Sequence, residues 1–319
     1  MPKVSVIIPC YNGARFIGRA VRSAASQEGV GQVEIVVVDD CSTDDSLAVL
    51  RQLETEIPSM RVLSSETNGG PGVARNRALG AAAGAWIALL DADDAFAPGR
   101  LRRLIEAAEE ADVDIIADYL VHYDLEADAP APAQDLPELP MRRLGLGDLV
   151  SPDPVTGLDL GLLKPVFRRH LVDKGFWRYR AGIRHGEDFD LYVRLFRNQV
   201  SFGLLGEAFY LFSTRIGAHT GRYSPGSVTQ VDYRSIAAQS LALLDELRSH
   251  AADLDESLFD SLQKRAQRAL WQNRVYGWTA LRKGSWARLL AWLGADQRNM
   301  VELAQIGLAK LVGQRGLPA

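Results

Sequence analysis

The segment Trp86-Ile87-Ala88-Leu89-Leu90-Asp91-Ala92-Asp93-Asp94 decides the fold, because an apolar run typical of a buried strand ends abruptly in three carboxylates. Closely spaced carboxylates repel one another, so a fold rarely collects them without a cation or a capping role nearby. Asp oxygens suit Mg²⁺ or Mn²⁺, ions that usually bind through one or two carboxylates together with substrate phosphates. We therefore expect a metal–diphosphate site at the end of a strand, unless these residues only cap the turn ahead of Pro98.

Two earlier apolar runs, residues 4–8 and 35–38, also end in polar residues, namely the stretch 9–13 and the pair Asp39-Asp40. Apolar residues at helical spacing follow each run. This alternation of near-continuous apolar strands with helices predicts an α/β fold, Rossmann-like, with a mixed, mostly parallel sheet flanked by helices. Ligands of such sheets bind outside the carboxyl ends of the strands, where these polar residues gather. Asp39-Asp40 can instead cap the following helix.

Length and composition indicate an ordinary globular protein. The 319 residues allow one large domain or two smaller ones, and the apolar share of 47% is enough for a sizeable core. The chain has neither a secretory signal pattern nor an uncharged apolar run long enough to span a membrane. Cys10 and Cys41 fit no zinc or disulfide spacing. We expect two free thiols and a cytoplasmic location.

The C-terminal part differs in charge from the rest. Residues 231–319 carry 12 Lys and Arg against 9 Asp and Glu, whereas the whole chain has a net charge of −4. The pattern from Tyr233 onward is helical, so we predict an α/β domain over residues 1–230 and a helical C-terminal region over residues 231–319. This region also holds four of the six tryptophans: Trp271, Trp278, Trp286 and Trp292.

Tryptophan and basic residues in helices suit an anionic membrane surface. We therefore expect the C-terminal region to be a candidate for peripheral docking on the inner membrane. At helical spacing, however, Trp271 and Trp278 share a face with Lys264 and Arg282. Helices that pack back on the first domain, or on a second copy in a homo-oligomer, are the alternative.

Common phosphate-binding motifs are absent. The first turn, residues 9–16, has one glycine, where a dinucleotide fold needs G-x-G-x-x-G, and no Walker A motif occurs in the chain. The D-x-D sequence follows the fourth predicted strand, whereas a haloacid-type phosphatase has it after the first. A diphosphate would thus be held by a metal and basic side chains. The net negative charge of residues 1–230 gives no support to nucleic-acid binding.

A second group of acids, Glu187, Asp188 and Asp190, begins a helix whose apolar side is marked by Phe189 and Tyr192. Acids are favourable at a helix N-terminus, so this position also has a purely structural explanation. Arg75, inside an earlier predicted helix, is either a site residue or a solvated one.

At this point five blocks of sequence carry a resemblance, in this order: VSVIIPCYNGARFIGRAVRS, EIVVVDDCSTDDS, NGGPGVARNRAL, WIALLDADDAFAPGRL and GEDFDLYVRL. Together they cover most of residues 3–197 and resemble inverting glycosyltransferase family 2, which implies the GT-A fold. The later text KPVFRRHL and the last block are similar to bacterial exopolysaccharide glycosyltransferases of the succinoglycan kind.

The resemblance assigns a donor-binding role to several residues. Pro9, Tyr11 and Asn12 match the stretch that lines the base and ribose of the nucleotide. Asp40 matches the acid that hydrogen-bonds the uracil edge. Arg75 matches the basic residue near the base and diphosphate.

The resemblance also assigns the metal and the chemistry. Asp93 matches the direct ligand of Mg²⁺ or Mn²⁺, and Asp91 matches a residue at the ribose or beside the metal. Asp188 matches the catalytic base, with Glu187 next to it. We assign Asp94 no more than a cap of the helix that follows Pro98.

The chain departs from the family pattern in lacking Q-x-x-R-W, the motif of processive polymer synthases. Arg215, His219 and Arg222 occupy that region and are candidates for lid or diphosphate contacts. This departure favours transfer of a single sugar.

The implied reaction moves one sugar, with UDP-glucose or UDP-galactose as the expected donor, to a hydroxyl of a saccharide or lipid-linked acceptor in bacterial polysaccharide synthesis. The alternatives are an enzyme for another cell-surface glycan, a non-catalytic nucleotide-sugar-binding protein, or a nucleotidyltransferase, whose N-terminal phosphate-binding glycines and Lys are missing here.

Overall fold

The chain divides into two compact units at residues 230 and 231. The computed structural model describes the following residues: 3–124, 129–130, 139–151, 153–154, 156, 159–183, 186–214, 233–250, 256–282, 293 and 298–300.

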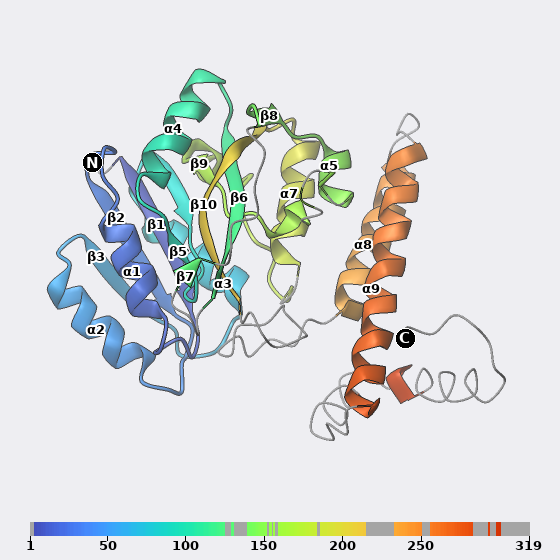
Figure 1. Ribbon diagram of the computed structural model, residues 1–319, viewed down its shortest axis with the longest axis horizontal. Helices are drawn as coiled ribbons and strands as arrows, with labels where there is room; N and C mark the ends of the chain where they lie inside the picture. Colours follow the sequence, from blue (N-terminus) through green and yellow to red (C-terminus); the bar gives the residue numbers. More distant parts are fainter. Residues whose placement is uncertain are drawn as a thin grey trace. The chain divides into compact units, whose positions relative to one another are not determined.

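The first unit alternates strands and helices through its first half, as Figure 1 shows. Its elements in chain order are β1 (Val4–Cys10), α1 (Ile17–Ala25), β2 (Val33–Asp39), α2 (Ser46–Glu56), β3 (Met60–Ser64), α3 (Pro71–Ala81), β4 (Trp86–Leu89), β5 (Ala95–Phe96), α4 (Arg100–Glu110), β6 (Ile115–Asp124), β7 (Ala129–Pro130), β8 (Arg142–Arg143), α5 (Leu146–Val150), the 3₁₀ turn η1 (Leu160–Leu162), β9 (Val166–Arg168), α6 (His170–Asp173), α7 (Glu187–Arg197) and β10 (Phe202–Thr214).

One mixed sheet runs through this unit in the order β3-β2-β1-β4-β9-β6-β10-β5. Strands β1 to β4 are parallel to one another, and β6 is parallel to β10. The carboxyl ends of these strands therefore lie along one edge of the sheet, where ligands of such folds bind. The predicted mixed, mostly parallel sheet is confirmed.

Strand β9 runs opposite to its two neighbours, β4 and β6. It is antiparallel to β4 on one side and to β6 on the other, so that Phe167 lies between Ile87 and Ile115. Because its direction is reversed, the residues just before β9, Lys164 and Pro165, lie at the edge where β4 ends. The short apolar run Val166-Phe167 did not predict this strand.

Helices cover both faces of the sheet. On one face, alternate residues of β1 pack in a core with side chains of α1, α2 and α4; representative members are Val6, Ile8, Ile17, Leu50 and Leu101. Helix α3 packs against β1 and β2, and its buried residues Ala74, Ala78 and Leu79 lie outside that core, which indicates the opposite face. Strand residues buried on both faces explain the near-continuous apolar runs of the sequence.

Gly84, just before β4, allows a close approach of two backbone segments. Its N–H donates to Ser5 Oγ at 2.7 Å, and a Cβ atom there would lie 2.7 Å from the carbonyl carbon of Val4. We expect Gly84→Ala to lower the free energy of unfolding by about 1–3 kcal/mol, as overpacking does. The exposed Gly80 in the last turn of α3 has no neighbouring atom in the way.

Gly80→Ala is therefore the matched control, and it should raise the free energy of unfolding by about 0.5–1 kcal/mol, because alanine stabilises a helix relative to glycine. Urea denaturation of the three proteins measures both changes. Equal stability of the two variants would contradict the tight packing at Gly84.

The described part of the second unit consists mainly of helices α8 (Tyr233–His250) and α9 (Glu256–Arg282), which pack on each other. Asn299 accepts hydrogen bonds from Arg234 at 2.8 Å and from Asn273 at 2.9 Å. Trp271 is 48% exposed on α9. Among the described residues, no helix has both the length and the hydropathy that crossing a membrane requires.

Candidate active site

The ends of β1 and β2 are joined by hydrogen bonds between the loops that follow them. The Asn12 N–H donates to Ser42 Oγ at 3.0 Å, and Asn12 Oδ1 accepts from the Thr43 N–H at 2.8 Å. Asn12 has a positive φ of 51°, a conformation that asparagine tolerates better than most residues. Pro9 lies within β1, and Tyr11 is 39% exposed. The three residues expected at the base and ribose thus lie at the predicted edge of the sheet.

Asp40 is buried at the same edge and organises the loop ahead of α3. Its two carboxylate oxygens accept from the backbone N–H groups of Gly69, at 3.0 Å, and Gly70, at 2.7 Å. Gly70 has a φ of 84°, which favours glycine. Asp40 therefore ties the end of β2 to the start of α3, the helix that carries Arg75.

The three aspartates after β4 have different contacts. Asp91 pairs with Arg75 at 2.7 Å and with Lys164 at 3.3 Å. The backbone carbonyl of Asp93 accepts from Arg19 at 2.7 Å and also from the Ser213 hydroxyl, and its side chain is half-buried. Asp94 is fully buried and turns toward β10.

The assignment of Asp94 as a helix cap is wrong. Its carboxylate accepts from the Tyr210 hydroxyl at 2.7 Å and from the Ser213 N–H at 2.8 Å, and α4 has no side-chain cap at its N-terminus. Burial, and then repulsion from Asp93 and Asp91, raise the pKa of Asp94 well above its usual range. Asp94 therefore fastens β10 to this loop.

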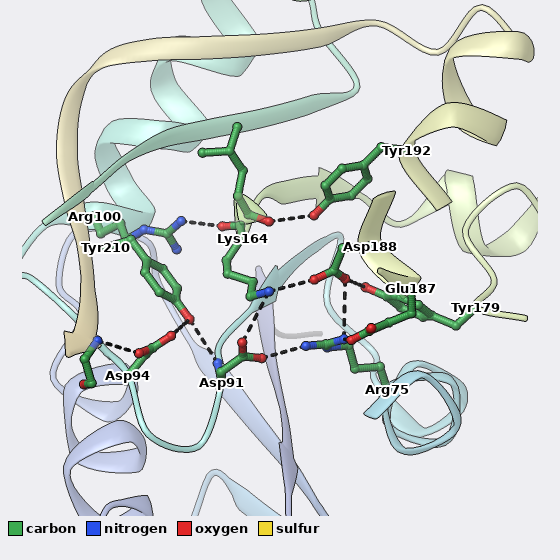
Figure 2. A network of polar contacts seen from close by, with 12 residues as sticks. Arg75, Asp91, Asp94, Arg100, Lys164, Tyr179, Glu187, Asp188, Tyr192 and Tyr210 are labelled. Carbon is green, nitrogen blue, oxygen red and sulfur yellow. Dashed lines mark hydrogen bonds and ion pairs between the residues drawn. The ribbon is translucent and has the colours of Figure 1, made fainter. Parts of the chain in front are cut away.

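Arg75 contacts the acids after β4 and the acids that begin α7, as Figure 2 shows. It is 3% exposed and reaches Asp91 at 2.7 Å, Glu187 at 2.8 Å and Asp188 at 3.4 Å. Its guanidinium also lies over the ring of Tyr179, 5.4 Å from the centroid. One buried cation from α3 therefore joins the acids after β4 to the acids that begin α7. This contact brings together residues almost a hundred positions apart.

Lys164 makes a second connection between the same two groups of acids. Its ammonium lies 2.6 Å from Asp188 and 3.3 Å from Asp91. The hydroxyl of Tyr179 donates to Asp188 at 3.0 Å. Asp188 is itself buried, so each oxygen of its carboxylate has a fixed partner.

The two cations set the charge of the site. Burial raises the pKa of Asp91, but attraction to Lys164 and Arg75 outweighs burial and lowers it to about 2. Burial by itself lowers the pKa of Lys164. Attraction to Asp188 and Asp91 outweighs burial and raises this pKa above its usual value, so the ammonium stays charged. Burial and repulsion from Asp188 raise the pKa of Glu187. Two cations thus face three acidic side chains, of which Asp91 has a strongly lowered pKa.

The number of carboxylates at this edge determines whether it can bind the expected Mg²⁺ or Mn²⁺. Among the described residues, no group of three or more His, Cys, Asp and Glu side chains is arranged to hold an ion. Mg²⁺ usually needs only one or two carboxylates when the substrate supplies phosphates. The edge of the sheet offers Asp91 and the half-buried Asp93, a number of carboxylates that fits such an ion.

The structure thus brings together Asp91, Arg75, Glu187 and Asp188. Arg215, His219 and Arg222 lie outside the described residues, as do Trp286 and Trp292. Lys164, Tyr179 and Tyr210 were missed. Only one feature of the sequence could have indicated Lys164, namely that it precedes Pro165 and the short apolar run Val166-Phe167. These residues belong to KPVFRRHL, which was noted only for its similarity to exopolysaccharide glycosyltransferases.

Comparison with known proteins gives a consistent picture. Residues 5–157 match the model of the family described as glycosyl transferase family 2. Succinoglycan biosynthesis protein ExoU of Rhizobium meliloti is 34% identical over 248 residues, which cover 76% of this chain and 69% of ExoU. Succinoglycan biosynthesis protein ExoO of the same organism is 37% identical over 193 residues, 60% of this chain. The matched part spans only 55% of the length of ExoO.

A solved structure shares the fold. The crystal structure of Staphylococcus aureus TarS 1–349 in complex with UDP-GlcNAc superposes with a TM-score of 0.63 and 22% identity, covering 92% of this chain and 80% of that one. This likeness confirms the expected GT-A architecture.

Proposed function

Because the chain belongs to glycosyl transferase family 2, we propose that it transfers a single sugar, with inversion, from a nucleotide-diphosphate donor to an acceptor hydroxyl in bacterial polysaccharide synthesis. The observation that carries the proposal is the joining of two acidic groups at one edge of the sheet by Arg75 and Lys164. The acids after β4 then serve the donor, and the acids that begin α7 serve the acceptor.

On the acceptor side, Asp188 is the proposed base. The acceptor oxygen attacks the anomeric carbon while the bond to the diphosphate breaks, and the hydroxyl proton passes to the Asp188 carboxylate. A single in-line displacement needs only one base, which separates this chemistry from that of retaining glycoside hydrolases, which need a second carboxylate as nucleophile. Glu187 lies beside it and shares the charge of Arg75.

On the donor side, Pro9, Tyr11, Asn12 and Asp40 are the proposed contacts of the nucleotide. Asp93 would hold Mg²⁺ or Mn²⁺, with Asp91 beside it; such an ion, when bound, offsets the negative charge that develops on the leaving diphosphate. Asp91 is kept ionised by its two cationic partners.

The proposed donors are UDP-glucose and UDP-galactose. Binding can be tested by following the melting temperature with a panel of these two sugars and UDP-GlcNAc, each with Mn²⁺. The matching donor at 100 times its Kd should stabilise the protein by roughly 2.7 kcal/mol through mass action. Mn²⁺ alone and UMP serve as controls.

The absence of any shift across the panel would contradict the proposal. Measuring UDP release in the same samples separates transfer from binding alone, because a non-catalytic nucleotide-sugar-binding protein would melt at a higher temperature without releasing UDP.

A further inference from the structure

Lys164 is a buried lysine that takes part in no step of the reaction proposed so far. It is 6% exposed, and lysine is almost never buried unless it is paired. Here one ammonium pairs with two carboxylates that come from distant parts of the chain, Asp188 at 2.6 Å and Asp91 at 3.3 Å. Lys164 therefore fixes the position of the acceptor-side carboxylate relative to the donor-side one.

The backbone that carries Lys164 is held from two directions, as Figure 2 shows. Arg100 donates to the carbonyl of Lys164 at 2.5 Å, and the hydroxyl of Tyr192 donates to the carbonyl of Leu163 at 2.7 Å. Both donors are fully buried. The flexible side chain of Lys164 therefore begins from a fixed point and ends on two carboxylates.

Arg100 is itself rigidly placed. It pairs with Asp118 at 2.7 Å, and neither side chain is exposed. The guanidinium contacts the faces of two rings, 4.4 Å from the centroid of Phe96 and 5.0 Å from that of Tyr210. A buried pair of this kind is weak evidence for stability, because the cost of removing two charges from water offsets their attraction. Its geometric effect is to hold the carbonyl of Lys164.

We propose that Lys164 is a positioning residue, which holds the carboxylate of Asp188 in the orientation that receives the proton of the acceptor hydroxyl. The inference rests on the proposed role of Asp188 as base. Ammonium–carboxylate hydrogen bonds are short and strong, and a misplacement of about 1 Å at a reacting centre can lower the rate about 100-fold.

The test follows UDP release from UDP-glucose, UDP-galactose and UDP-GlcNAc with Mn²⁺, with water as the acceptor. The proteins are the wild type, Lys164→Met, Asp188→Asn and the double variant. Lys164→Met should lower kcat about 10- to 100-fold and leave the donor KM nearly unchanged. In the Asp188→Asn background the same substitution should have almost no effect on kcat, because residues that act through one another are not additive.

A milder variant covers the case in which Lys164→Met does not fold. Tyr192→Phe removes only the hydroxyl that holds Leu163, and it should lower kcat at an unchanged KM in the wild type but not in Asp188→Asn. Tyr119→Phe is the matched control, since it also loses one buried hydroxyl contact, to Asp153 at 3.3 Å, and this contact does not reach the site. Its kcat should equal that of the wild type.

The outcomes separate the two proposals. The positioning role is overturned if Lys164→Met keeps the kcat of the wild type. It is also overturned if Lys164→Met lowers kcat equally in the wild type and in Asp188→Asn. If only Tyr192→Phe can be measured, the same two outcomes for that variant overturn the role. Near-normal kcat in Asp188→Asn itself overturns the proposed base, and with it the ground for this inference.

Discussion

Asp188→Asn is expected to lower the turnover of sugar transfer by about 10²–10⁴-fold, the usual effect of losing a general base, while the affinity for UDP stays nearly intact. The amide keeps the size of the side chain but cannot take the acceptor proton. Steady-state kinetics, combined with calorimetry of UDP in the presence of Mn²⁺, measure both quantities.

Asp190→Asn is the matched control for this variant. Asp190 lies in the same first turn of α7, but it pairs with Arg180 and Arg194, each at 3.1 Å, rather than with the central cations. Its turnover should stay close to that of the wild type. Near-normal turnover in Asp188→Asn, or equal losses in the two variants, would rule out Asp188 as the base.

Asp93→Asn is expected to remove the dependence of UDP binding on the metal. With Mn²⁺ present, the affinity for UDP should fall by at least about 10- to 100-fold. Replacing a residue that only hydrogen-bonds to a metal ligand already causes a loss of this size. Without Mn²⁺ the variant and the wild type should bind UDP equally. Calorimetric titration of both proteins with UDP, with and without Mn²⁺, measures the four affinities.

Asp112→Asn removes the same charge at the opposite end of the sheet, before β6 begins, and its positive φ of 48° suits asparagine. This control should bind UDP as the wild type does. If the wild type bound UDP equally with and without Mn²⁺, the role of Asp93 would be wrong whatever the variant did.

Much of the proposed donor side could be predicted from sequence because its residues directly follow apolar strands. Parallel strands end at one edge, so locating Asp40 and Asp91 after two of them was enough to predict that they lie on that edge. Asp188 was assigned by resemblance to a motif, and Arg75 likewise. Their direct contact was not predicted, because it depends on how α3 and α7 approach each other.

The remaining site residues depend on long-range pairing that local patterns do not encode. Asp94 looked like a helix cap because a proline follows shortly after, yet its partner Tyr210 lies on the last strand of the first unit. Arg100 stands among other arginines in a sequence typical of an exposed helix, and only its pairing with Asp118 explains its burial. Lys164 could not be placed without knowing that β9 is reversed.

The reversed strand β9 has a consequence for how the protein can vary. Every parallel strand sends its chain away from the binding edge after delivering a residue to it, whereas β9 receives its chain there. The segment that arrives includes α5 and η1, and both contact α7, the helix that begins with Glu187 and Asp188. On the proposed role of Asp188 as base, we expect substitutions in this segment to change the preference for acceptors and to leave the strands that precede the proposed nucleotide contacts unchanged.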